Sequence, residues 1–569
     1  MAESPAWSTT VDRLIDRYNS GELSRRDFLR TASAIIGGVA AAGGLSGAFA
    51  QGATPEAAAT PAVAIIPAAK TGGKFTYALN QAGDTLDPAI TTYAMTNKIN
   101  INVFDPLIWQ APDLSYVPGL ASSYEVAPDG MSFTFHLRQD VKFHDGTPLN
   151  AAAVKFSWDR IMLPETQSKT AIGQMGPFKQ AVVVDEFTVR AEFGKPFAPF
   201  LDAVSQSYCA PVSPAAVAKF GTDFAHNLVG TGPFKLKEWV ENDHVTLVKN
   251  PDYNWAPSIF GHQGAAYLDE IVFPIIIDDS VRTGTLQSGE SDGIDSVAAK
   301  DVSLFSGDTT TYRVLNSAVP GIPNLFTLNT QKAPTDDLAV RQALNFATDK
   351  ATIISTLFFN QYVPAYGPMS AATLGFDPTL KDLFPFDVAK ANAALDAAGW
   401  VMGAGGIRAK AGQPLKISLY TAPTDLTPPL LQSQWKAVGI DTEINQMDYN
   451  ALIPIMTKGD GNLGNIGWIQ ADPDVASIIL SSKNIGTAFN WSRYTSPDLD
   501  KALTDAASTV DQAKRTELYG KVQQLAMAAA LVVPINDLAA IYALHSYVKN
   551  FRIDTRGWYP WLYDVWMDK

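Results

Sequence analysis

The 569 residues are 46% hydrophobic and 18% charged, which is typical of a globular protein long enough for two or more domains. The formal net charge is −14, and residues 1–50 hold five basic and five acidic side chains, so their removal would leave it unchanged. An acidic chain without a basic run is poorly suited to nucleic acid or to an anionic membrane surface, so both are excluded as partners.

The first 50 residues are typical of an export signal. Arg25 and Arg26 precede a weakly hydrophobic, Ala/Gly-rich segment at 31–49, and a small-x-small triplet ends at Ala50, the predicted cleavage site. The paired arginines resemble a twin-arginine signal, which predicts export of a folded protein to the periplasm or another extracytoplasmic location. An amphipathic helix with a chance arginine pair is the alternative interpretation.

Residues 51–70 are mostly Ala, Pro and Thr and are predicted to be a linker, so the folded protein should begin near Thr71. The single cysteine, Cys209, cannot form a disulfide within the chain. We expect it to be a buried, inert thiol, with a reactive thiol as the alternative. Because no cysteine follows the signal, a lipid anchor on a new N-terminal cysteine is excluded.

Four segments have the pattern of β-strands. Apolar and polar residues alternate at 131–138 and at 187–193, as in half-buried strands. The apolar run 271–277, interrupted by Pro274, predicts a strand buried on both faces. A further apolar strand is expected at 531–533.

Helical patterns lie between these strands. Apolar residues recur at helical spacing in 335–347, after a possible N-cap at Thr335. An alanine-rich helix is predicted at 387–398, ending at Gly399, and a longer amphipathic helix at 514–530. The mixture predicts an α/β protein. Because no flexible linker divides the rest of the chain, we expect lobes joined by strands that cross between them.

The sequence gives no clear support for catalysis. Its six histidines form no HExxH pair or other metal-like spacing, and no phosphate-binding loop is present. Acidic pairs such as Asp278-Asp279 and Asp336-Asp337 are interpreted as solvated turns or helix starts. Catalytic triads assemble in space, so a hydrolase stays possible, but we predict no enzyme activity, no cofactor and no metal.

Residues 118–148 carry a family resemblance. A predicted strand at 131–138 lies between the turns Asp129-Gly130 and Asp145-Gly146, whose glycines allow the positive φ that such turns demand. This block resembles the signature of the peptide/nickel solute-binding proteins of ABC importers. Further blocks agree in the family's order: 86–88, 230–234, 250–253, 340–344, 349–350, 397–400, 412–415 and 438–440.

The resemblance runs from about Thr71 to the C-terminus and implies a two-lobed periplasmic-binding-protein (Venus-flytrap) fold of the large class. Such proteins close on their ligand by hinge motion. Lobe I would be 71–324 plus 534–569, with an extra subdomain at about 110–225, and lobe II would be 325–533. The crossing strands are expected at 324–329 and 531–536.

The resemblance also implies a candidate ligand site. In peptide-binding members, an aspartate shortly after a Gly-Trp pair binds the ligand's α-ammonium, and Asp472 follows Gly467-Trp468. Two alignments stay open: Asp472 takes that role with one inserted residue, or 472–474 matches a later Asp-Pro-Asp sequence with a deletion. A turn-forming Asp-Pro pair is the third interpretation. The other candidates are Trp468, Trp491, Asn490, Tyr93 and Tyr494, with core packing as the alternative for the aromatic residues.

The implied function is that of a receptor that encloses a small solute and docks on an ABC permease and ATPase complex. A peptide is the first choice of ligand, followed by nickel chelates, sugars and other amphiphilic solutes. We expect a monomer that makes and breaks no bond. The alternatives are a secreted hydrolase and a receptor that serves a sensor instead of an importer.

Overall fold

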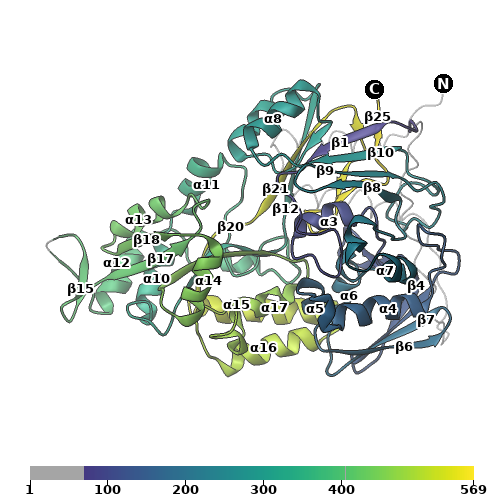
Figure 1. The fold of residues 1–569 in the computed structure, drawn as a ribbon. Helices are drawn as coiled ribbons and strands as arrows, with labels where there is room; N and C mark the ends of the chain where they lie inside the picture. Colours follow the sequence, from purple (N-terminus) through teal and green to yellow (C-terminus); the bar gives the residue numbers. More distant parts are fainter. Residues whose placement is uncertain (1–68, 404) are drawn as a thin grey trace, which may run out of the picture. The chain divides into compact units, whose positions relative to one another are not determined.

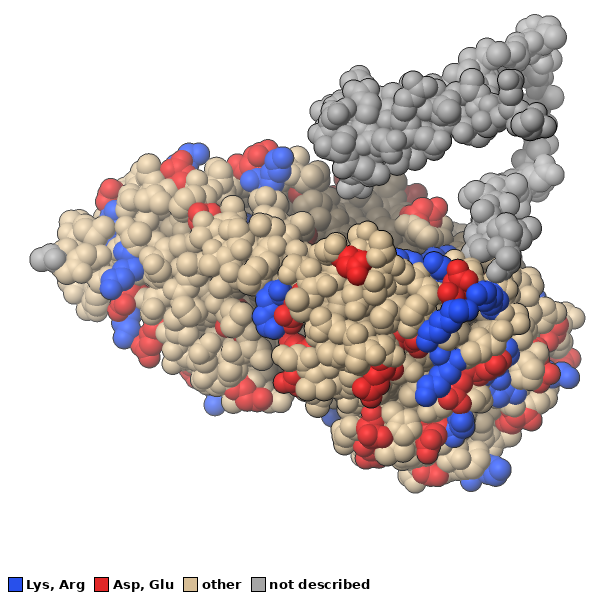
Figure 2. Space-filling view, turned by 90° about the horizontal axis from the view of Figure 1, so that it is seen from above, with Lys and Arg blue, Asp and Glu red and all other residues tan. Residues whose placement is uncertain are grey.

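The computed structural model describes residues 69–403 and 405–569, all within one compact unit that begins at Ala62 (Figure 1). The predictions for Arg25, Arg26 and Ala50, and most of the predicted linker, lie outside the described residues. No helix among the described residues is long and apolar enough to cross a bilayer. On the face seen in Figure 2, acidic and basic side chains are interspersed.

Two central sheets organise the described residues. A seven-stranded sheet has the order β12-β21-β11-β1-β10-β9-β8, and a five-stranded sheet has the order β18-β17-β19-β13-β20. The strands of the first are β1 (Lys74–Ala78), β8 (Phe234–Val240), β9 (His244–Lys249), β10 (Glu270–Pro274), β11 (Gly293–Ile294), β12 (Tyr312–Ala318) and β21 (Ala539–His545). The strands of the second are β13 (Gly321–Leu328), β17 (Lys416–Thr421), β18 (Asp441–Gln446), β19 (Leu463–Ile469) and β20 (Val532–Asn536).

We call the part with the seven-stranded sheet lobe I (69–319 and 538–569) and the part with the five-stranded sheet lobe II (320–537). Both sheets mix parallel and antiparallel pairs: β1 is parallel to β10 and β11, and β17 is parallel to β18 and β19.

The helices of lobe I are α3 (Ala94–Asn100), α4 (Ala151–Met162), α5 (Thr170–Met175), α6 (Phe200–Ala203), α7 (Pro214–Phe220), α8 (Asp279–Ser288) and α9 (Ser303–Ser306). Those of lobe II are α10 (Leu338–Phe346), α11 (Lys350–Phe358), α12 (Val388–Ala397), α13 (Pro428–Lys436), α14 (Tyr449–Lys458), α15 (Ala476–Leu480), α16 (Pro497–Ser508) and α17 (Gln512–Ala528).

A four-stranded antiparallel sheet stands apart within lobe I. Its order is β4-β5-β7-β6, and α4 packs against β6 and β7. The strands are β4 (Ala121–Val126), β5 (Ser132–Leu137), β6 (Phe178–Asp185) and β7 (Thr188–Phe193).

The single cysteine, Cys209, is buried in lobe I, as predicted. Burial raises the pKa of its thiol far above the ordinary value. The thiol therefore stays protonated and unreactive.

Most predicted elements are confirmed. Strands β5 and β7 and helix α12 lie where the sequence indicates them, with Asp387 as the N-cap of α12 and Gly399 just beyond it at φ +84°. Helix α17 begins two residues earlier than expected, because Asp511 caps it by accepting from the backbone N–H of Lys514.

Two predictions about element ends are wrong. Helix α10 is capped by Asp337, which accepts from the backbone N–H of Ala339, and not by Thr335, whose hydroxyl donates to the carbonyl of Asn329. The run 271–277 is a strand only as far as Pro274, and its burial alternates, because one of its faces is only partly covered.

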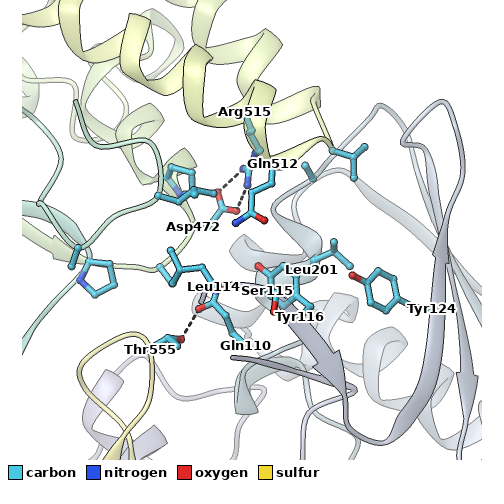
Figure 3. A pocket seen from close by; sticks show the side chains of 17 residues that line it. Gln110, Leu114, Ser115, Tyr116, Tyr124, Leu201, Asp472, Gln512, Arg515 and Thr555 are labelled. Carbon is cyan, nitrogen blue, oxygen red and sulfur yellow. Dashed lines mark hydrogen bonds and ion pairs between the residues drawn. The ribbon is translucent and has the colours of Figure 1, made fainter. Parts of the chain in front are cut away.

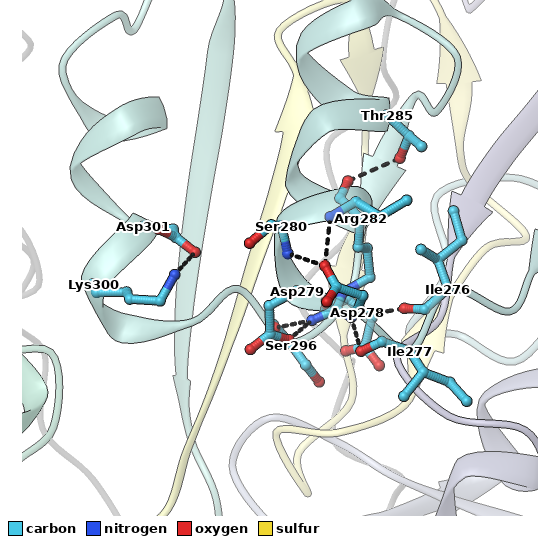
Figure 4. Close-up of polar contacts among 12 residues, drawn as sticks. Ile276, Ile277, Asp278, Asp279, Ser280, Arg282, Thr285, Ser296, Lys300 and Asp301 are labelled. Atoms are coloured by element: carbon cyan, nitrogen blue, oxygen red, sulfur yellow. Dashed lines mark hydrogen bonds and ion pairs between the residues drawn. The ribbon is translucent and has the colours of Figure 1, made fainter.

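Buried Arg282 fixes the chain beyond Pro274 (Figure 4). It donates to the carbonyls of Ile276, Ile277, Asp295 and Ser296 at 2.7–3.2 Å and so joins the segments that follow β10 and β11. These bonds fix the chain where β10 ends, although the backbone N–H of Ile276 still donates to the carbonyl of Leu79 at 2.8 Å.

The chain changes sheet between Ala318 and Gly321 and returns between Asn536 and Ala539, a few residues from the expected positions. Ladder pairing flanks both passages: Ala318 lies opposite Ala539 and Asn324 opposite Asn536. Between them, the backbone N–H of Val319 donates to the carbonyl of Leu538 at 3.0 Å. The two passages therefore form one short antiparallel connection between the lobes.

Gly321 occupies a position in this connection that no other residue fits. Its φ is +128°, and a Cβ there would collide with the carbonyl oxygen of Trp468. We expect Gly321→Ala to lower the free energy of unfolding by about 2–4 kcal/mol, measured by urea denaturation. Gly146→Ala is the control, because Gly146 has φ +86° and open space around its Cβ position; strain alone should cost about 1–2 kcal/mol there. Equal losses would contradict the steric argument.

Candidate functional site

A cavity of about 280 Å³ lies between the lobes and is lined by residues of both (Figure 3). Its volume is near the lower end of the range usual for small-molecule sites, about 300–1,000 Å³. Lobe I contributes Gln110, Leu114, Ser115, Tyr116, Tyr124, Ala198, Leu201 and Thr555. Lobe II contributes Pro320, Ala372, Leu374, Ala471, Asp472, Pro473, Val510, Gln512 and Arg515.

A hairpin presents the lobe I side of the cavity. Strands β2 (Ile108–Gln110) and β3 (Tyr116–Pro118) pair antiparallel, and the loop between them carries Leu114 and Ser115. The carboxylate of Asp113 shapes this loop by accepting from the backbone N–H and the hydroxyl of Ser115, at 3.0 and 2.6 Å. At its base, Thr555 donates to the side-chain oxygen of Gln110 at 2.7 Å.

An ion pair dominates the lobe II side. Asp472 is the N-cap of the 3₁₀ turn η6 (Pro473–Val475), and Arg515 lies in the first turn of α17. The two guanidinium nitrogens of Arg515 donate to the two carboxylate oxygens of Asp472, each at 2.7 Å. Both side chains are buried, so this is a bidentate, charge-balanced pair in the cavity wall.

Arg515 connects three segments of lobe II: its own helix α17, the turn η6 and the end of α16. Its Nε donates to the carbonyl of Ala506 near the end of α16, at 3.1 Å. Burial acts to lower its pKa, but Asp472 outweighs that effect and raises the pKa above the ordinary value. The neighbouring Asp474 has its pKa raised to about 6 by burial and by the charge of Asp472.

A second charged cluster, of one guanidinium and two carboxylates, lies in lobe I next to the cavity residue Thr555. Arg556 donates to Asp202 at 2.6 Å, to the hydroxyl of Ser205 at 2.7 Å and to Asp554 at 3.2 Å. The pKa of the Tyr116 hydroxyl is raised well above its usual value, first by burial and then by the carboxylates of Asp202 and Asp472. The hairpin tyrosine is therefore within electrostatic reach of both ion pairs, one from each lobe.

The lobes also touch away from the strands that join them. The backbone N–H of Ala198 in lobe I donates to the carbonyl of Ala507 in lobe II at 3.0 Å. A more open recess of about 380 Å³ adjoins the cavity and shares Leu114, Ala372 and Thr555 with it. The enclosed cavity thus has a neighbouring space into which a longer ligand could extend.

Two of the predicted site residues lie at or near the lobe boundary. Asp472 lines the cavity, but Arg515 and its own helix-capping bond occupy its carboxylate. Trp468 pairs with Ile322 at the end of β19 next to the crossing connection, and its side chain is 36% exposed. Neither Trp468 nor the remaining candidates line the cavity.

The other four predicted residues lie elsewhere. Tyr93 is 44% exposed at the start of α3. Trp491 is fully buried in the lobe II core and donates to the hydroxyl of Thr457 at 3.3 Å. Asn490 is buried and bonded to Ser481 and Ser492, while Tyr494 packs against the same core. Their surroundings favour packing roles for Trp491, Asn490 and Tyr494.

Sequence patterns did not indicate most of the cavity residues. Gln110, Tyr116, Tyr124 and Thr555 belong to segments separated by up to about 445 positions, as the bond from Thr555 to Gln110 shows. The one available signal was the turn-like 111–115 stretch between two apolar segments, which predicts a hairpin but not its partner lobe.

Comparison with known proteins places the chain in a family. The model of the bacterial extracellular solute-binding proteins, family 5 Middle, matches residues 115–487. The glutathione-binding protein GsiB of Salmonella typhi is 27% identical over 467 residues, covering 79% of this chain and 86% of GsiB. Its counterpart in Pectobacterium atrosepticum is 27% identical over 456 residues, covering 77% of this chain and 84% of that protein.

Solved structures of solute-binding proteins superpose on the chain over most of its length. NikA from Brucella suis, in complex with Fe(III)-EDTA, superposes with a TM-score of 0.76 at 25% identity, covering 87% of this chain and 100% of NikA. The periplasmic binding protein DppA from Helicobacter pylori, in complex with the peptide STSA, gives a TM-score of 0.70 at 25% identity, with 88% and 99% coverage.

Proposed function

Because the chain belongs to the bacterial extracellular solute-binding proteins of family 5, we propose that it captures a short peptide between its lobes and delivers it to a membrane permease. Members of this family are binding receptors of ABC importers, and the protein is accordingly a solute-binding receptor and not an enzyme. Its place of action is extracytoplasmic.

Two features support a ligand site between the lobes. Residues of both lobes line the cavity, and a two-stranded connection joins the lobes. A ligand that contacts both walls favours the closed arrangement, since it binds that state better than an open one. The boundaries at 319–320 and 537–538 are our proposed division of the lobes.

The peptide class is supported by the character of the wall. Hydroxyls of Ser115, Tyr116 and Tyr124 and the amide of Gln512 offer neutral donors and acceptors that suit peptide groups. Apolar side chains such as Leu114 and Leu201 line the same cavity. The relatives named for glutathione and for a bound tetrapeptide point to the same class.

We retain Asp472, Trp468 and Tyr93 as proposed contributors to ligand binding. Asp472 is in the wall, and the two aromatic side chains are exposed enough to meet a ligand. We assign Trp491, Asn490 and Tyr494 to the support of the lobe II core behind them. Export through the Arg25-Arg26 signal, cleavage after Ala50 and a monomeric state also belong to this proposal.

The test is a thermal-shift screen of the exported protein against peptides of two to five residues, sugars, opines and nickel chelates. A ligand that binds only the folded state raises the melting temperature by mass action, by the equivalent of about 2.7 kcal/mol at 100 times Kd. We expect peptides to give the largest shifts. Shifts from another class with none from peptides would refute the peptide proposal.

A further inference from the structure

The charged groups in the wall of the cavity are already matched to one another. Among the residues that line it, Asp472 is the only carboxylate and Arg515 the only cation, and they form one pair. The rest of the lining is apolar or neutral. The space that a ligand enters therefore has balanced charge.

The Asp472 carboxylate has little capacity left for a ligand cation. Its two oxygens accept from Arg515 at 2.7 Å each, and one also accepts from the backbone N–H of Asp474 at 2.8 Å. A ligand ammonium would have to share these oxygens with a guanidinium a few ångströms away. Two cations that compete for one carboxylate in a confined cavity repel each other.

The charge of Arg515 is matched in the same way. Two of its nitrogens are used by Asp472, and its Nε donates to the carbonyl of Ala506. A ligand carboxylate would meet the same conflict with Asp472. Neither end of a zwitterion finds an unmatched opposite charge in this wall.

Two carboxylates and one guanidinium form a second charged cluster, which does not line the cavity. Asp202 and Asp554 are held by Arg556, and Asp202 also accepts from Gln206 at 2.9 Å. Backbone N–H groups of Trp558 and Tyr559 donate to Asp554. Both carboxylates are buried and already hydrogen-bonded; Asp554 lines the adjoining recess, and neither lines the cavity itself.

We infer that the part of the ligand enclosed between the lobes carries no charge, and is bound through neutral hydrogen bonds and apolar contacts. This inference rests on the proposed function and narrows it: a peptide places its backbone amides and uncharged side chains in the cavity. In a peptide short enough to be wholly enclosed, the termini are chemically blocked, because a free terminus would place a charge in the cavity.

The test compares matched peptides by isothermal titration calorimetry. Each tripeptide of alanine, serine or leucine is used with free termini and in an N-acetylated, C-amidated form. We expect the blocked peptide to bind at least about tenfold more tightly, because an unpaired charge is costly to desolvate. Equal or tighter binding of the free form would overturn the inference.

Two variants separate a charge effect from a structural one. Arg515→Gln leaves the Asp472 carboxylate unmatched and should shift the preference toward peptides with a free ammonium by at least about tenfold. Lys501→Gln removes the same charge from an exposed side chain of α16 in the same lobe and should leave the preference unchanged. An unchanged preference in Arg515→Gln would count against the inference, and if that variant fails to fold, the wild-type comparison still decides.

The outcome also separates this inference from the proposed function. If no peptide binds in either form but neutral sugars do, the peptide proposal fails while the neutral-ligand inference is supported. If only a charged opine or a nickel chelate binds, both fail.

Discussion

Replacing Asp472 by alanine is expected to lower the free energy of unfolding by about 3–5 kcal/mol. The substitution leaves the Arg515 guanidinium buried without its bidentate partner and removes the cap of the turn η6. Urea denaturation of the variant and the wild-type protein, monitored by tryptophan fluorescence, measures the loss.

The matched control for this prediction is Asp505→Ala. Asp505 pairs with Lys501 at 2.6 Å, but both side chains are exposed, so its loss should cost less than about 1 kcal/mol. The double variant Asp472→Ala/Arg515→Met should be more stable than Asp472→Ala alone, because it leaves no buried charge. A cost below about 1 kcal/mol for Asp472→Ala would show that the pair contributes little to folding.

The second large loss of stability is expected for a substitution of Asp295 in lobe I. Its carboxylate pairs with the ammonium of Lys98 at 2.6 Å, and both side chains have no exposed surface. Lys98 also lies over the ring of Trp558, 3.9 Å from its centre. Asp295→Ala should lower the free energy of unfolding by about 3–5 kcal/mol, because the buried ammonium then keeps only its cation–π contacts with Trp558 and Tyr542. Thermal and urea unfolding would detect it.

Burial affects the protonation of Lys98 in this ion pair. Burial lowers the pKa of Lys98, and Asp295 counteracts that effect, so removing the carboxylate favours loss of the proton. Lys98→Met/Asp295→Ala should recover part of the stability lost in Asp295→Ala. If the double variant is no more stable than the single one, the loss comes from packing and not from the stranded ammonium.

Local patterns were enough for much of the fold. Alternation located β5 and β7, and the Asp387 and Gly399 boundaries located α12, because strand pleat and helix capping depend on residues close in the chain. The N-cap of α10 was predicted wrongly as Thr335. Two aspartates follow Thr335 in the sequence, and the folded chain shows that the second of them, Asp337, is the cap.

The ligand site was harder to predict. The motif order led to the family and hence to a site between lobes, and Asp472 does line the cavity. The motif could not show that Arg515, 43 positions later, already pairs with that carboxylate. It also could not show that the hairpin at 108–118 faces it from the other lobe.

The sequence by itself therefore determined the α/β class and the family, since these depend on composition and on short segments in order, and it predicts the export signal. Only the tertiary structure decided which residues enclose the cavity and that their charges are balanced. Charge balance is a property of side chains brought together by two crossings of the chain between sheets, and no local pattern encodes those partners.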